Sequence, residues 1–232
     1  VPPADILGLI PTWVGVYLAL VLAISFSGYA IYSRVFRLIF QGKSVARFDR
    51  PLERLTGATA IVLGQRKVLQ RVGSTDARSR RIDLAGLGHA SIFWGFLSFT
   101  LSYGIFIFGN SVSHPLAETI LTTTGVKVFS IYLDILAVII LAALIWGLTR
   151  RWLAKPYRLS FDLTRNRDAV IVVALTAALM VVTLLVHAFY VAGGGTGPEA
   201  SVLIGGVIGN WFGSLGLTIG AADSLQVIFW WV

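Results

Sequence analysis

The chain has 232 residues, of which 56% are hydrophobic and only 13% are charged. A soluble domain carries about 25% charged residues, so this composition excludes an ordinary soluble domain and favours an integral membrane protein. In a soluble protein a net charge of +8 would indicate a nucleic-acid partner. Here the positions of the basic residues are those that set the orientation of a membrane protein, so we expect no nucleic-acid partner. The absence of cysteine excludes disulfides, zinc–thiolate sites and iron–sulfur clusters held by these residues.

Five apolar segments follow one another, and each complete one is long enough to cross a lipid bilayer as a helix. We predict helices at about residues 12–33, 84–108, 128–148 and 169–191, and a fifth from about 224. The fifth run is still apolar at 232, so we expect that helix to be cut short. The prediction is an all-α integral membrane fold, a single five-helix transmembrane domain over residues 1–232.

The connection between the fourth and fifth segments, residues 192–222, is rich in glycine and has an apolar middle. That middle is too short for a span. We expect it to lie along the outer membrane interface or to cap the bundle.

Basic residues lie almost wholly in two connections. Twelve of the 19 fall in residues 34–83 and six in residues 149–168, and only Lys127 lies elsewhere. The positive-inside rule places both loops in the cytoplasm and the N-terminus outside, as in a multi-pass protein of the inner membrane. Orientation and contact with anionic lipid explain the charge of the first loop. The alternative is a docking surface for an acidic or redox partner, with Arg80 and Arg81 reaching haem propionates.

Two histidines lie inside predicted spans. His89 is about five residues into the second helix, near its cytoplasmic end, and His187 is near the outer end of the fourth. At a rise of 1.5 Å per residue they differ in depth by roughly 20 Å. A single membrane histidine can simply hydrogen-bond a neighbouring helix, but one in each leaflet favours axial ligands of haem iron. Two haems with two histidines each need four, so we expect the remaining ligands from the continuing fifth helix.

Three other residues are weaker candidates. His114 lies in an outer loop, as a solvated residue or as part of a quinone site. Asp134, in the third helix, has three open interpretations: an ion pair with Lys127, a proton acceptor for a quinol, or a structural carboxylate. Asp223 is expected to cap the fifth helix.

The stretch LGQRKVLQRVG at residues 63–73, followed by GLGHASIFWGFLSFT at 86–100, resembles the membrane domain of heterodisulfide-reductase-related iron–sulfur oxidoreductases. That domain is similar to the gamma subunit of respiratory nitrate reductase. The segments RNRDAVIVVALTAALMVVTLLVHAFY and LQVIFWWV resemble the fourth and fifth helices of the same family.

The resemblance implies a cytochrome b-type domain that binds two b-type haems. His89 would ligate the iron of the cytoplasmic-side haem and His187 that of the outer-side haem. The family's fifth helix supplies the other two ligands, one of them just after a Trp-Trp pair. Iron–sulfur clusters would lie on a missing domain or on a heterodisulfide-reductase-like partner chain. Electrons would pass between that partner, or an electron-transfer flavoprotein, and menaquinone, as in a component of a respiratory quinone oxidoreductase.

Two other classes stay open. One is a transporter or channel subunit, with His187 and Asp134 on a proton or substrate path. The other is a structural anchor that assembles a larger complex in the bilayer. Detection of bound haem would separate both from an electron-transfer domain.

Overall fold

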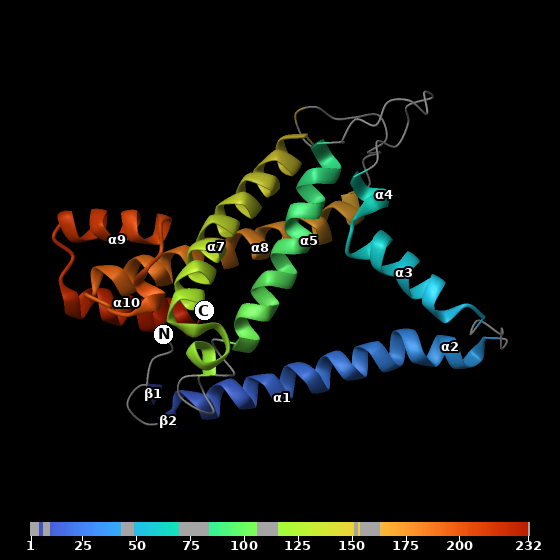
Figure 1. Cartoon of the computed structure of the whole chain (residues 1–232), viewed down its shortest axis with the longest axis horizontal. Coiled ribbons are helices and arrows are strands. Elements are labelled where there is room, and N and C mark those ends of the chain that lie inside the picture. Colours follow the sequence, from blue (N-terminus) through green and yellow to red (C-terminus); the bar gives the residue numbers. More distant parts are fainter. Residues whose placement is uncertain are drawn as a thin grey trace. The chain divides into compact units, whose positions relative to one another are not determined.

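A computed structural model of the chain describes residues 5–6, 10–42, 49–69, 84–105, 116–150, 153 and 163–231 (Figure 1). Most of these residues are helical, so the all-α prediction is confirmed. The strands in the described part are β1 (Asp5–Ile6) and β2 (Ile10–Pro11), which pair antiparallel. The chain forms two units, one of Ala4–Lys67 and one formed mainly by Val68–Val232. Each is described by itself, and the single-domain organisation stays a prediction.

The first unit contains one long helical segment. Helix α1 (Thr12–Ile31) continues through a π-helical turn, η1 (Tyr32–Phe36), into α2 (Arg37–Gln41). It ends at Gly42, whose ψ of 156° is extended. We predicted an end near residue 33, before Arg34. A charged residue marks where the chain leaves an apolar environment, but it does not stop the helix, because arginine is a good helix former.

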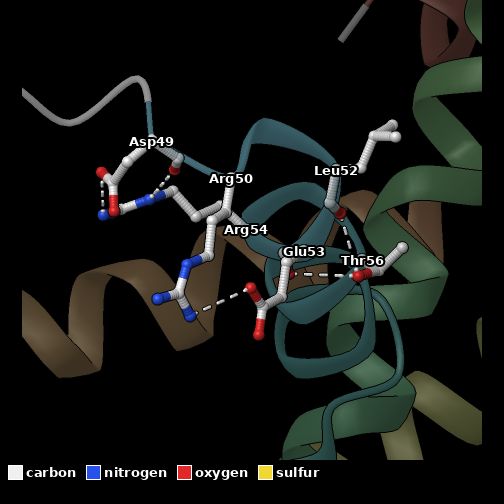
Figure 2. A network of polar contacts seen from close by, with 6 residues as sticks. All are labelled: Asp49, Arg50, Leu52, Glu53, Arg54 and Thr56. Atoms are coloured by element: carbon white, nitrogen blue, oxygen red, sulfur yellow. Dashed lines mark hydrogen bonds and ion pairs between the residues drawn. The ribbon is translucent and has the colours of Figure 1, made fainter.

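Part of the first basic loop is also helical. Helix α3 (Pro51–Val62) is followed by the single turn α4 (Arg66–Leu69). Figure 2 shows the start of α3, where Arg54 donates hydrogen bonds to the Asp49 carboxylate (2.7 Å) and to its main-chain oxygen (2.8 Å). Arg50 and Glu53 form a second ion pair at 3.6 Å. Both pairs are exposed, so each contributes about 0–1 kcal/mol.

The second unit carries the predicted histidines. Helix α7 contacts both α5 and α8, and α8 also contacts the two following helices, α9 and α10. In Figure 1, α9 and α10 lie alongside the C-terminal part of α8. The elements are α5 (Leu84–Ser102), α7 (Leu116–Thr149), α8 (Leu163–Ala192), η4 (Pro198–Ala200), α9 (Ile204–Ser214) and α10 (Ile219–Trp231).

The core of this unit is centred on α7. Gly95 of α5 lets the two helices approach closely, because a Cβ there would overlap the side chain of Ile140 on α7. Ser98 and Tyr132 share a hydrogen bond of 2.8 Å across the same pair of helices. The buried apolar residues of the core are Phe99, Leu133, Leu136, Ala137, Ile140, Leu144, Met180 and Leu184.

Several helices begin earlier than predicted. Helix α7 starts at residue 116 rather than 128, with a break at Thr122 (φ 63°, ψ 163°), whose hydroxyl accepts a hydrogen bond from the Gly125 N–H (3.4 Å). Helix α8 starts at 163 rather than 169, and α10 at 219 rather than 224. The predictions followed apolar runs, whereas α7 and α8 extend through polar residues at their starts, and α10 begins in the short apolar stretch at 219–222.

Three helical segments in the described part are long and apolar enough to cross a membrane: Thr12–Gln41, Thr119–Thr149 and Arg167–Ala192. They correspond to the first, third and fourth predicted spans and support a membrane protein. Helix α5, our second predicted span, has 19 residues, and α10 has 13. Neither α5 nor α10 is among the three segments that are long and apolar enough to cross a membrane.

Candidate functional site

Asp134 of α7 accepts hydrogen bonds from the first turn of α9. Its Oδ2 takes one from the Ile204 N–H, and both carboxylate oxygens lie 3.2 Å from the Gly205 nitrogen, which donates to them. Leu203, the residue before α9, makes no side-chain cap. The first N–H groups of a helix have no partner within the helix and carry partial positive charge. Asp134 therefore caps α9 from a different helix, and its side chain is fully buried there.

His187 of α8 lies against the same carboxylate. Its Nδ1 is 3.6 Å from Asp134 Oδ1, just beyond hydrogen-bonding distance. That nitrogen is buried, and it has no hydrogen-bond partner among the described residues. The side chain as a whole is 27% exposed, so part of it is accessible although Nδ1 is buried. A buried unsatisfied polar atom costs about 1–3 kcal/mol, which favours a small ring movement that closes this gap.

Two glycines let α9 approach α8. A Cβ at Gly205 would lie 2.7 Å from the His187 Cβ, and one at Gly209 would lie 2.5 Å from the main-chain oxygen of Ala188. A Cβ at Gly206 or Gly213 would have no other heavy atom within 4 Å. Small residues four apart are the usual means by which membrane helices bring their backbones together. Gly205 therefore brings the first turn of α9 against His187 and Asp134.

An aromatic cluster holds the three helices together beside the site. Phe189 of α8 stacks on Phe212 of α9, with ring centroids 5.3 Å apart and planes inclined by 12°. Phe189 also contacts Phe229 of α10, with ring centroids 5.5 Å apart. Because Phe189 is two residues from His187, these contacts fix the segment of α8 that carries the histidine.

Glycine caps end the two helices nearest the site. Gly194 (φ 77°) follows α8, and the N–H groups of Gly194 and Gly195 donate to the Val191 and Tyr190 carbonyls. Gly216 (φ 89°) follows α9 with the same pattern of bonds. Both are Schellman motifs, in which glycine adopts a left-handed conformation at low cost.

The other sequence candidates lie elsewhere. His89 is exposed on α5, and Lys127 is exposed on α7. The suggested ion pair between Lys127 and Asp134 is wrong, because the Asp134 carboxylate contacts α9 and His187. The prediction that Asp223 caps the fifth helix is also wrong. Helix α10 begins four residues before it, where the Thr218 hydroxyl accepts a hydrogen bond from the Ala221 N–H (3.4 Å).

His114, Arg80 and Arg81 lie outside the described residues. Within the part that the structure describes, no three His, Cys, Asp or Glu side chains come together to hold a metal ion.

Sequence reasoning missed the contact between Asp134 and His187 and the packing role of Gly205. The signal for the second was present as glycines at 205, 209 and 213, a repeat of four. The first had no local signal, because the two residues are 53 positions apart and meet through the packing of α7 on α8.

The surroundings of His187 are those in which a histidine could ligate a metal ion. A ligating histidine binds the metal through one ring nitrogen and gives its other N–H to a carboxylate, a carbonyl or water. His187 has a carboxylate beside its buried Nδ1, which leaves Nε2 as the nitrogen that could bind a metal. His89 is exposed within its unit, so its ring is available to a ligand.

Comparison with protein-family models, with curated proteins and with solved structures found no match in any of the three.

Proposed function

We propose that this chain is a membrane electron-transfer domain that binds b-type haem through His89 and His187. Electrons would pass between a cytoplasmic iron–sulfur or flavoprotein partner and the menaquinone pool. The observation that carries the proposal is the environment of His187, whose buried Nδ1 lies 3.6 Å from a buried carboxylate. A small ring movement that closes this gap would form the hydrogen bond by which a carboxylate orients a metal-ligating histidine.

Haem iron supplies reversible one-electron chemistry when bound. The protein's part is to hold each ligand and to limit the access of water. In the proposed role His187 presents Nε2, while α7 and α9 hold its other side. The aromatic cluster of Phe189, Phe212 and Phe229 keeps α8 in place beside this histidine.

The course of α10 supports a ligand from the fifth helix. Asp223 lies against Gly193 just after α8, and Phe229 contacts Phe189 six residues later. Residue numbers rise along α10 as they fall along α8, so the two helices are antiparallel. The last turn of α10 therefore approaches the level of His187.

The proposal includes the topology inferred from charge: a five-helix bundle of the inner membrane, an outer N-terminus, and cytoplasmic loops at 34–83 and 149–168. In this frame His89 lies near the cytoplasmic side and His187 near the outer side. Two haems, one at each level, would carry electrons across the bilayer.

The decisive experiment is a reduced-minus-oxidised absorption spectrum of the full-length protein, purified in mild detergent. We expect b-type haem bands that correspond to two haems. His187→Ala should remove the outer haem and His89→Ala the other, each lowering the haem content by about half. His114→Ala, in a predicted loop, is the control and should leave the spectrum unchanged. A haem-free full-length protein would refute the proposal, as would an unchanged spectrum in His187→Ala.

A further inference from the structure

Asp134 has more bonding capacity than the cap of α9 uses. A carboxylate has about four lone-pair positions on its two oxygens. Oδ2 accepts hydrogen bonds from the N–H groups of Ile204 and Gly205. Oδ1 accepts only from the Gly205 N–H, which it shares with Oδ2, and it is the oxygen that lies 3.6 Å from His187 Nδ1. A further hydrogen bond to Oδ1 is therefore possible without loss of the cap.

The geometry also indicates which partner moves. Asp134 is fully buried and held by main-chain N–H groups of α9, so its carboxylate is fixed. The His187 side chain keeps 27% exposure, so its ring can turn. The nitrogen–oxygen distance of 3.6 Å exceeds a usual hydrogen bond by about 0.6 Å, a distance that a small rotation of the ring covers.

The hydrogen bond would determine which ring nitrogen carries the proton. In neutral histidine one nitrogen is a donor and the other an acceptor, and the choice follows the hydrogen bond that is made. A carboxylate beside Nδ1 accepts and cannot donate when ionised. It selects the form with hydrogen on Nδ1 and a lone pair on Nε2.

We propose that Asp134 is a positioning residue for His187, which holds the Nδ1–H form of the ring and leaves the Nε2 lone pair facing the ligand site. The inference rests on the proposed function for the identity of that ligand, a haem iron, but the state of the ring stands independently of it. Helix α9 contributes to this positioning, because its first turn fixes the Asp134 carboxylate and Gly205 brings that turn against His187.

Asp134→Asn separates capping from positioning. An asparagine can still cap α9 through its Oδ1, but it then offers an N–H toward His187 Nδ1. That change selects the opposite form, with hydrogen on Nε2, which cannot bind iron. The matched control is Asp223→Asn, an exposed carboxylate on α10 that makes no contact with His187.

The test uses full-length protein with ¹⁵N-labelled histidine in lipid bilayers, chemically reduced, with His187 assigned from the His187→Ala spectrum. In the unsubstituted protein we expect nitrogen shifts of a protonated Nδ1 and an Nε2 without hydrogen. In Asp134→Asn we expect about 10- to 100-fold weaker binding of the outer haem, and a protonated Nε2 in molecules without that haem. Asp223→Asn should match the unsubstituted protein in both measurements.

Two results would overturn the inference. One is a protonated Nε2 on His187 in the unsubstituted protein, a measurement that does not require Asp134→Asn to fold. The other is an Asp134→Asn protein with the original ring form and the original haem affinity. If the unsubstituted protein binds no haem but the ring form still switches in Asp134→Asn, the positioning role stands and the proposed function fails.

Discussion

The contact between α9 and α8 predicts opposite effects for two neighbouring glycines. In Gly205→Ala the new methyl group would lie 2.7 Å from the His187 Cβ, 3.3 Å from Val202 Cγ2 and 3.4 Å from Asp134 Oδ1. Carbon atoms pack at about 3.5–4.0 Å, so α9 must move away by roughly 1 Å. The atom in the way is a Cβ, which moves only with the backbone of α8. Gly206→Ala, one residue later, meets nothing within 4 Å.

The magnitudes follow from these two environments. Overpacking of a tight contact costs about 1–3 kcal/mol, so we expect Gly205→Ala to lower the free energy of unfolding by that amount. The shift would also lengthen the hydrogen bonds from α9 to Asp134. Gly206→Ala removes only the conformational freedom of a helical glycine and should stabilise by about 0.5–1 kcal/mol. The two variants should therefore differ by roughly 1.5–4 kcal/mol.

Unfolding in a graded mixture of mild detergent and dodecyl sulfate measures this difference, with helix content and tryptophan fluorescence as signals. Gly209→Ala serves as a second test site, because its Cβ would lie 2.5 Å from the Ala188 main-chain oxygen. It should behave as Gly205→Ala does. Equal stability of Gly205→Ala and Gly206→Ala, within about 0.5 kcal/mol, would refute the packing of α9 on α8 that we describe.

Three further predictions follow. Phe189→Ala removes two aromatic pairs of about 0.5–1.5 kcal/mol each, so unfolding in the same assay should become easier by about 1–3 kcal/mol; an unchanged midpoint would contradict the cluster. Gly216→Ala forces a side chain into φ 89° and should cost about 1–2 kcal/mol, whereas Gly213→Ala, in open helical space, should be neutral or stabilising. Because the chain has no cysteine, the variants Ser74→Cys and Ser214→Cys each carry a single thiol that reports the topology. In intact cells an impermeant maleimide should label only Ser214→Cys. Labelling of Ser74→Cys alone would mean that the orientation is the reverse of the proposed one.

The sequence predicted the helical class and the approximate place of each long helix, because apolar runs of about 20 residues have few other stable forms in lipid. It did not predict where the helices begin. Residues 164–168 are polar or charged, yet they lie at the start of α8. A run of hydrophobic residues marks the part of a helix that faces lipid or core, and the hydrogen-bonded helix continues into water with residues of good propensity.

The candidate site was predicted in part. His187 and Asp134 stand out in any sequence of this kind as ionisable residues inside apolar helices. Their contact depends on the packing of α7 on α8 and on the position of α9, none of which is encoded locally. The glycine repeat at 205, 209 and 213 was visible, but its spacing does not reveal that the first two face α8 and the third faces open space.

The first turn of α9 shows why Asp134 and this short helix depend on one another. A buried carboxylate in an apolar helix is costly unless it is paired. The free N–H groups at the start of a helix are costly when no water reaches them. In this chain each satisfies the other, since Ile204 and Gly205 donate to Asp134 and the N-cap residue Leu203 makes no side-chain cap. The apolar middle of the glycine-rich connection after α8 is therefore a short helix whose first turn is held by α7. Its position, in turn, fixes the carboxylate that faces His187.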